Sequence, residues 1–444
     1  MDQKRAAMSV RPPDPPLFQF RSVSSSERLI SIDALRGFAL IGILVVNTLF
    51  FAFPLITALS PPWADNGETA GSTGDWTSWW IINLFFQYKF MTIFSILFGV
   101  GAAIQWNRAR LAGKNFDSFF LKRLVVLFGF GVIHALFFWY GDILAVYALC
   151  GVWLLLFCRL SNRALIPLVV GLLVFTALLS GGFTALDLEA TNQAQDSSLI
   201  ASESDAESQL GFDAIFTSNF NPKSEIWSTA ELQAYQDGPY QDLFVFRAIT
   251  WMMYIVITML SNGWHIMAMF ALGVLLYRSG FFEDGAAGER LRTLTIYVGL
   301  PIGLLIESAC CLVQMLYMQE QPGHLIWIMM IHELSVPLVS MGYASIVINL
   351  VRSGTFQWLI HALSCTGRMA LTNYLLETVV MTSVFYYYGF GLFGTVERIY
   401  LIPVALVTWT MLAFISVAWL GAYRQGPVEW LWRRLTYGST VARG

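Results

Sequence analysis

The sequence predicts an all-α polytopic transmembrane bundle of about ten spans, or about ten to twelve depending on one ambiguous segment. Of the 444 residues, 56% are hydrophobic and only 12% are charged, whereas soluble domains carry about 25% charged residues. Apolar runs of about 17–25 residues, the length that a helix needs to cross a bilayer, recur along most of the chain. The lipid bilayer is therefore the expected environment, and no basic block indicates a nucleic-acid partner.

Basic residues set the predicted orientation. Segments 1–28 and 106–123 are rich in Lys and Arg, whereas segment 58–78 carries only acidic charges. Because basic loops stay in the cytoplasm, both termini are expected there, provided that 244–260 is a helix at the outer surface or partly re-entrant. The expected divisions are a disordered cytoplasmic leader (1–28), a first transmembrane half of about five helices (29–181), an acidic extracytoplasmic segment with an interfacial helix (182–262), a second transmembrane half of about five helices (263–424) and a cytoplasmic tail (425–444).

A polar stripe runs along the first apolar segment. Arg36 and Asn47 are eleven residues apart, and at about 100° per residue they fall on one helix face. Two interpretations stay open. Either Arg36 pairs with Asp33 at the interface and Asn47 bonds a neighbouring helix, or the stripe binds an anionic ligand that arrives from the cytoplasm. Arg123 and His134 repeat the same spacing in a later segment.

Three carboxylates, Glu307, Glu333 and Glu377, fall inside apolar segments. A charge at the centre of a membrane helix costs about 2.5–3.5 kcal/mol, so these groups should face the interior, pair or stay protonated. His332 precedes Glu333, and Asn373 lies four residues before Glu377. The carboxylates belong either to a functional site or to an internal polar network that only fixes helix packing.

Histidine next to a carboxylate serves general base catalysis, and equally a proton relay. His134 and Asp142 are one such pair in the sequence, although His134 could be a packed core residue and Asp142 a helix cap. Gly-rich phosphate loops, zinc signatures and nucleophile elbows are absent from the sequence. The five cysteines lie in or beside apolar runs without Cys-x-x-Cys spacing, so neither a metal site nor a disulfide framework is expected.

A family resemblance is carried by segments 31–47, 89–90, 94–101, 131–134, 141–148, 367–374 and 426–433. They are similar to the corresponding parts of the YeiB-like bacterial membrane proteins, a family grouped under a domain of unknown function. The resemblance covers nearly the whole chain after the leader. It implies a multi-pass protein of the bacterial cytoplasmic (inner) membrane, and it implies no established activity.

The opening Arg36-Gly37 pattern also resembles a wider group of multi-helix membrane acyltransferases. That resemblance implies transfer of an acyl group from cytoplasmic acyl-CoA to an extracytoplasmic acceptor such as a surface sugar. The heparan-acetylating enzymes of the group have their working histidine near the first outer loop, whereas segment 48–78 of this chain contains none. If the chemistry is shared, the role falls first to His134 and second to His332 with Glu333.

The first hypothesis is therefore a membrane O- or N-acyltransferase without a metal. Arg36, Arg123 and Arg368 would attract the phosphates of the acyl carrier, because arginine suits phosphate geometry. His134 would act as base, supported by Asp142 or Glu377. The full expected binding set is Asp33, Arg36, Asn47, Lys89, Arg123, Arg368 and Asn373.

Two other hypotheses stay open. A transporter or permease for a small solute, perhaps coupled to protons, would use Glu307, Glu333 and Glu377. A non-catalytic membrane organiser would have its polar groups bonded to each other and no cavity. The partner is a small molecule or a glycan in the first two cases, and no oligomeric state follows from the sequence.

Overall fold

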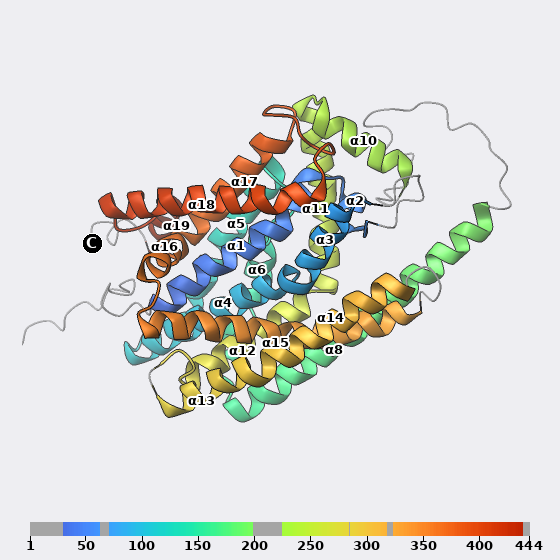
Figure 1. Cartoon of the computed structure of the whole chain (residues 1–444). Coiled ribbons are helices and arrows are strands. Elements are labelled where there is room, and N and C mark those ends of the chain that lie inside the picture. The colour runs from blue at the N-terminus through green and yellow to red at the C-terminus, as the bar shows by residue number, and fades with distance from the viewer. Residues whose placement is uncertain (1–29, 63–70, 199–223, 284, 318–322, 438–444) are drawn as a thin grey trace, which may run out of the picture.

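The computed structural model describes residues 30–62, 71–198, 224–283, 285–317 and 323–437 (Figure 1). The elements in these ranges are all helices, with no strand among them. Eight helical segments there are long and apolar enough to cross a membrane, and two shorter apolar helices, Gly263–Arg278 and Ala370–Phe385, accompany them. The predicted all-α polytopic bundle is confirmed.

The helices are as follows in chain order. The first group is α1 (Ile30–Ala52), α2 (Leu55–Leu59), α3 (Thr73–Ile81), the π-helix η2 (Ile82–Phe86), α4 (Lys89–Leu111), α5 (Phe116–Phe137), α6 (Leu144–Gly151), α7 (Leu154–Phe157) and α8 (Asn162–Ser198). The second group is α10 (Glu225–Gln236), α11 (Tyr240–Leu260), α12 (Gly263–Arg278), α13 (Ala286–Leu294), the π-helix η3 (Thr295–Gly299), α14 (Leu300–Tyr317), α15 (His324–Ser353), α16 (Gln357–Arg368), α17 (Ala370–Phe385), α18 (Arg398–Ala422) and α19 (Pro427–Tyr437). The expected leader (1–28) and the middle of the acidic segment (199–223) lie outside the described residues.

Figure 1 shows α1 passing through the middle of the bundle, with α8, α14 and α15 side by side along one flank. Helix α10 lies at the end of the bundle where α1 finishes, and α16 and α19 lie near the end where α1 begins. We call the end where α1 begins the inner end, following the predicted orientation. The opposite end is the outer end.

Glycines allow the central helices to approach closely. A Cβ added at Gly37 of α1 would lie 2.0 Å from the carbonyl oxygen of Leu363 in α16. One added at Gly99 of α4 would lie 2.1 Å from the carbonyl oxygen of Phe270 in α12. Small residues at such contacts are how helices without a hydrophobic driving force pack tightly in lipid.

Gly99→Ala is expected to lower the free energy of unfolding by about 1–3 kcal/mol, because α4 and α12 must separate to admit the methyl group. SDS titration of the purified protein in mixed micelles measures the change. Gly129→Ala on α5 is the matched control, since nothing lies within 4 Å of its added Cβ. Equal losses in the two variants would contradict the packing argument.

Two apolar segments are interrupted, the first of them beside α1. The segment Thr73–Leu111 is apolar enough to span, but η2 ends at Phe86 and α4 starts only at Lys89. Tyr88 between them has a φ of 62°, which a bulky residue rarely adopts. The break lies beside the middle of α1, where Gly42 packs against Phe90.

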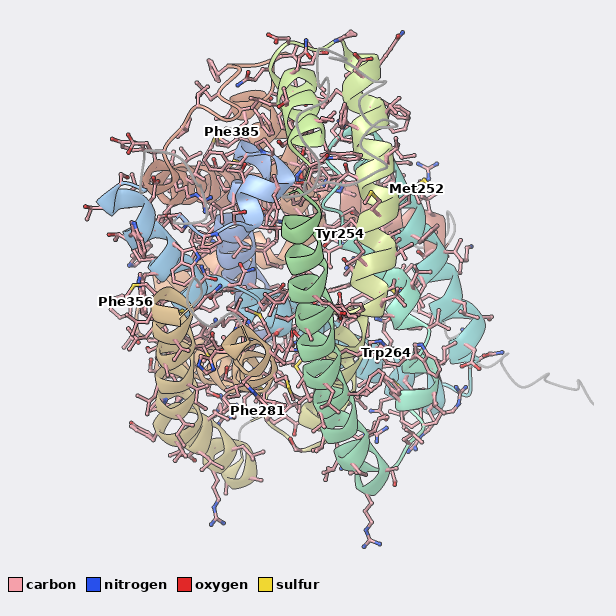
Figure 2. The ribbon with its side chains drawn as sticks, turned by 90° about the vertical axis from the view of Figure 1, so that its right-hand side faces the viewer. Met252, Tyr254, Trp264, Phe281, Phe356 and Phe385 are labelled. Atoms are coloured by element: carbon pink, nitrogen blue, oxygen red, sulfur yellow. The ribbon has the colours of Figure 1, made fainter. Side chains whose placement is uncertain are left out.

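The second interruption separates α11 from α12 at residues 261–262. The two helices run end to end, and Figure 2 shows Met252 on α11 above Trp264 on α12. The expected surface or re-entrant helix at 244–260 is thus a helix of spanning length. The predicted cytoplasmic termini require an odd number of crossings between the acidic segment and the basic Arg278, and one interrupted path through α11 and α12 counts as a single crossing.

Candidate functional site

A cavity of about 1300 Å³ lies within the bundle. Its walls come from α1, α4, α5, α6, α11 and the first turn of α17, and α19 contributes at the inner end. The lining changes from basic at the inner end, through apolar side chains such as Leu40, Phe94 and Leu97, to amide and aromatic groups at the outer end. A cavity of this size and gradient suits an elongated amphipathic ligand.

We call the inner part of the cavity the basic mouth. Two acidic side chains lie there, and both have partners: Asp33 Oδ1 is 3.3 Å from Arg36 Nη1, and Glu429 accepts hydrogen bonds from α17. The excess of basic groups gives the mouth a positive potential that attracts anions. Its basic residues are Arg36, Arg108, Lys114, Arg123, Arg368 and Arg433.

Helix α19 frames this mouth because both of its ends are attached to the bundle. Near its start, Glu429 Oε1 accepts hydrogen bonds from the first backbone N–H groups of α17 at 2.7 and 3.0 Å. Farther along, the guanidinium of Arg123 lies 4.2 Å from the ring centroid of Trp432 and donates to the Tyr437 hydroxyl at 3.2 Å. A carboxylate at a helix N-terminus and a cation over indole are both favourable.

The outer part of the cavity carries polar and aromatic groups. Asn47 lines it from α1. It lies eleven residues after Arg36, on the helix face that the polar stripe predicts. Trp139 and Tyr140 line it from the connection between α5 and α6. The Tyr140 hydroxyl is buried and makes no hydrogen bond to the described residues. The cavity therefore ends among groups that can bond a polar ligand.

His134 and Asp142 form a buried pair beside this outer part. His134 Nδ1 is 2.9 Å from Asp142 Oδ2, and His134 Nε2 is 2.9 Å from Thr378 Oγ1. The other Asp142 oxygen accepts from the Ala145 backbone N–H at 2.8 Å, at the start of α6. Tyr374, which does line the cavity, places its ring 5.1 Å from the imidazole. The pair therefore lies one side chain behind the wall.

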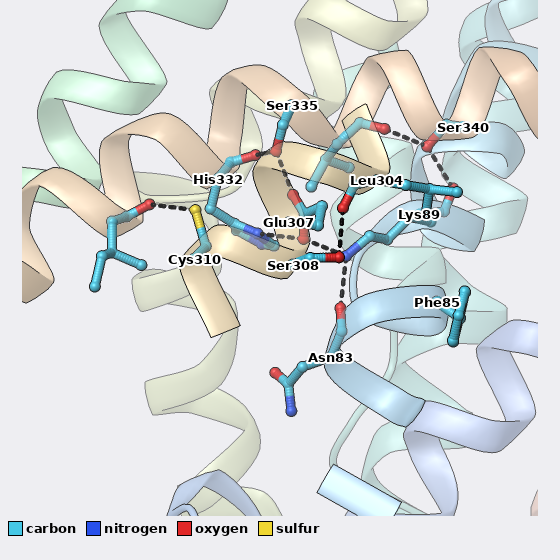
Figure 3. A network of polar contacts seen from close by, with 12 residues as sticks. Asn83, Phe85, Lys89, Leu304, Glu307, Ser308, Cys310, His332, Ser335 and Ser340 are labelled. Atoms are coloured by element: carbon cyan, nitrogen blue, oxygen red, sulfur yellow. Dashed lines mark hydrogen bonds and ion pairs between the residues drawn. The ribbon is translucent and has the colours of Figure 1, made fainter. Parts of the chain in front are cut away.

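A second group of polar side chains lies behind the cavity wall, between α4, α14 and α15 (Figure 3). Lys89 Nζ is 2.6 Å from Glu307 Oε2 and donates to the Asn83 carbonyl oxygen at 2.7 Å. The same carboxylate oxygen is 3.0 Å from His332 Nδ1, and its partner oxygen accepts from Ser335. Lys89 and Glu307 are both buried. The sequence predicted that Lys89 binds a ligand, but its ammonium group is paired with Glu307.

His265 and Glu333 make a third pair next to that group. His265 Nδ1 lies 3.2 Å from Glu333 Oε2, and its Nε2 lies 2.8 Å from Thr92 Oγ1. Both side chains are buried. Glu307 and Glu333 thus face the interior and are paired, as the sequence predicts for charged groups in apolar helices.

Asn373 and Glu377 differ from each other in their surroundings. The Asn373 amide donates to the Thr366 carbonyl oxygen at 3.0 Å and to Ser416 Oγ at 2.9 Å, so it ties α17 to its neighbours. Glu377 is buried, and its Oε1 makes no hydrogen bond to the described residues. Of the two carboxylates expected beside His134, Asp142 is the one that contacts it.

The expected site residues therefore divide into two groups. Those that line the cavity are Asp33, Arg36, Asn47, Arg123 and Arg368. Those held elsewhere in polar contacts or in the packed interior are Lys89, His134, Asp142, His332, Glu333, Asn373 and Glu377.

Sequence reasoning missed the contributions of Tyr88, His265 and Glu429. Glu429 follows Gly-Pro-Val and precedes Trp-Leu-Trp-Arg, a pattern typical of a short amphipathic helix at a membrane surface. That pattern could have indicated α19. A lone histidine such as His265 in an apolar run gives no comparable signal.

A buried carboxylate also holds the outer cap, α10, which is not among the candidate spans. The two oxygens of Glu231 lie 3.3 and 3.2 Å from the Leu55 backbone N–H at the start of α2. Burial raises the pKa of Glu231 to about 7, and the hydrogen bonds from Leu55 and Trp227 only partly oppose this.

The contribution of Glu231 to stability is expected to fall as the pH rises from about 4.5 to about 7. In this window the folded state keeps a proton that the unfolded chain has released, so unfolding becomes easier with increasing pH. Thermal unfolding at pH 5 and pH 8 should show a smaller pH-dependent loss in Glu231→Gln than in the parent. An unchanged difference between the two pH values would contradict this assignment.

The fold and the cavity define a class: a polytopic helical membrane protein with an interior cavity, a basic inner mouth and buried ion pairs. Comparison with known proteins identifies the family. The pattern of the family described as "Protein of unknown function (DUF418)" matches residues 276–439. The chain belongs to this YeiB-like family.

Two relatives match almost end to end. The uncharacterized protein YeiB of Escherichia coli (strain K12) is 31% identical over 417 residues, which cover 92% of this chain and 96% of the relative. The uncharacterized protein YxaH of Bacillus subtilis (strain 168) is 28% identical over 416 residues, which cover 94% and 96%. No solved structure matches the chain.

Proposed function

We propose that this protein is a membrane acyltransferase whose cavity holds an acyl group on a phosphorylated carrier such as acyl-CoA. The observation that carries the proposal is the order of surfaces in the cavity. A basic mouth suited to phosphates leads into an apolar middle suited to an acyl chain, and the far end lies beside the His134–Asp142 pair. Bacterial relatives support placing it in the cytoplasmic membrane.

The chemistry would be attack of an acceptor oxygen or nitrogen on the thioester carbonyl. The carbon–sulfur bond breaks as the new acyl bond forms, and the acceptor proton ends on the departing thiol. Histidine next to a carboxylate is a suitable temporary holder of that proton, because the carboxylate stabilises the imidazolium. Tyr374 and Trp139 are lining side chains whose ring centroids lie 5.1 and 6.4 Å from that of His134. For His134 to act as base, the Tyr374 ring would move aside and Nε2 would exchange Thr378 Oγ1 for the acceptor.

The acceptor would approach the outer part of the cavity. Asn47 and Tyr140 supply an amide and a buried hydroxyl there, and the aromatic rings of Trp139 and Tyr140 supply flat surfaces. Such groups suit a small polyhydroxyl molecule or a glycan. Helix α10, held to α2 through Glu231, covers this end.

Binding of long-chain acyl-CoA to the protein in nanodiscs tests the first part of the proposal. Arg433→Gln should weaken binding by about tenfold or more, because a hydrogen bond to a charged group is worth about 1.5–3 kcal/mol. Arg434→Gln is the matched control: it removes the same charge from the next position of α19, where the side chain is exposed and does not line the cavity. Equal affinities of the two variants, or no binding by the parent, would reject the basic mouth as a phosphate site.

A second candidate function is transport of a small solute. The two interrupted helices favour it, because half-helices that meet beside a cavity often form the substrate site of secondary transporters. Uptake of a labelled solute into proteoliposomes without thiol release from acyl-CoA would support this candidate over the first. The organiser hypothesis has less support, because it expects no cavity.

A further inference from the structure

Five ionisable side chains lie together behind one wall of the cavity; four are buried and the fifth, His332, is partly exposed. Lys89 pairs with Glu307, which also contacts His332, and His265 pairs with Glu333 (Figure 3 shows the first three). His332 and Glu333 are consecutive residues of α15, so the two sets are directly joined. We call these five residues the ion cluster.

The ion cluster begins at the two helix interruptions. Lys89 is the first residue of α4, and His265 lies in the first turn of α12. The bond between Thr92 and His265 connects these first turns, and Gly99 packs on Phe270 farther along. The two half-helices therefore run side by side in the same direction, starting at the same level.

The interruptions themselves line the cavity. Gln87 and Tyr88 come from the first, and Ser261 and Asn262 from the second. The Tyr88 side chain is hydrogen-bonded to Asn262, and its ring lies 5.6 Å from that of His332. Tyr88 thus touches the cavity, the other interruption and the ion cluster.

Charge counting gives the ion cluster an unpaired negative charge when both histidines are neutral. It contains one lysine and two carboxylates, and the other titratable side chains that face it are uncharged at neutral pH by their ordinary pKa values. A net charge buried among apolar helices is costly, whereas one added proton makes the cluster neutral. The other facing groups are Tyr88, Cys310, Cys311 and Tyr343.

We propose that the ion cluster is a proton-binding site, which holds one proton on His265 or His332 and is coupled through Tyr88 to the cavity wall. A proton on His332 pairs with Glu307, and a proton on His265 pairs with Glu333. The His332 side chain is 15% exposed, against 2% for His265, so His332 is the position where the proton exchanges. Only H⁺ moves, from an imidazole nitrogen to water or back, and no electrons are transferred.

Ring-¹⁵N spectra of the histidines in nanodiscs at pH 8, assigned with single His→Gln variants, test the proton count. The parent should show one imidazolium shared between His265 and His332. Glu333→Gln removes one negative charge from the cluster and should abolish that signal. Glu377→Gln, which changes a buried carboxyl outside the cluster, should leave it intact. Neutral rings at both positions in the parent overturn the proposal, whether or not the variants fold.

Labelling of an introduced cysteine tests the coupling to the cavity. The measured quantity is the rate at which a thiol reagent modifies Gln87→Cys, divided by the rate for Leu127→Cys, a second lining position away from the interruptions. This ratio should depend on pH. Each thiol keeps its own pKa in both backgrounds, so the part of the pH dependence that Glu333→Gln removes reports the coupling. The pH dependence should weaken when Glu333→Gln is added. A ratio independent of pH in the parent, or one unaffected by Glu333→Gln, shows that the cluster is not coupled to the wall.

Discussion

Replacing Lys89 with methionine is expected to lower the free energy of unfolding by about 3–5 kcal/mol, because it removes the permanently charged, buried partner of the Glu307 carboxylate. Lys89 and Glu307 have side chains that are 0% and 1% exposed, and their charged atoms are 2.6 Å apart. The Asn83 carbonyl oxygen also loses its donor. SDS titration in mixed micelles at pH 7 measures the loss.

Two further variants show that the effect comes from burial of the pair. Lys89→Met with Glu307→Leu should lose less than the sum of the two single changes, by about 0.5–3 kcal/mol. Arg159→Met breaks the pair with Asp117, whose side chains are 48% and 40% exposed, and should cost at most about 1 kcal/mol. A loss of that size for Lys89→Met would mean that the buried pair contributes no more than a surface one.

His134→Gln is expected to lower the rate of thiol release from bound acyl-CoA by about 10²–10⁴-fold, the usual contribution of a positioned acid–base group. The glutamine amide can still bond Asp142 and Thr378, so folding and carrier binding should be preserved. Thiol release followed with a chromogenic disulfide, beside the binding curve, separates the two effects.

His361→Gln supplies the control for that measurement, since His361 is an exposed histidine on α16 that does not line the cavity. It should keep the parent rate. If His134→Gln also keeps the parent rate while binding acyl-CoA normally, the His134–Asp142 pair is a structural contact and the base lies elsewhere. If it loses binding together with the rate, the pair acts through the shape of the cavity.

Composition and periodicity were sufficient to predict the helical bundle and one wall of the cavity. Eleven residues return an α-helix nearly to its starting face, so Arg36 and Asn47 had to share a surface, and both line the cavity. The residues of α1 between them are apolar, which accounts for the apolar middle part of the cavity lining. His134 and Asp142 are also close in sequence, and a short connection between α5 and α6 brings them together.

Other features depend on contacts that sequence spacing does not encode. Lys89 and Glu307 are 218 positions apart, and nothing local to either residue selects its partner. The break at Tyr88 contains neither Gly nor Pro, the residues that normally signal an interrupted helix, so the tertiary structure must hold its left-handed φ. The assignment of 244–260 to a surface or partly re-entrant helix followed from the parity of the crossings, which does not depend on where a helix is interrupted.

The attachment of α19 across the basic mouth has a consequence for biosynthesis. A membrane protein is inserted as it is made, from the N-terminus onward, and α19 is made after every other helix that lines the cavity. Until Glu429 reaches the start of α17 and Tyr437 reaches Arg123, the mouth lacks one side. A nascent chain therefore has an unfinished opening at the inner end, and the lining of its cavity is completed only after α19 has been made.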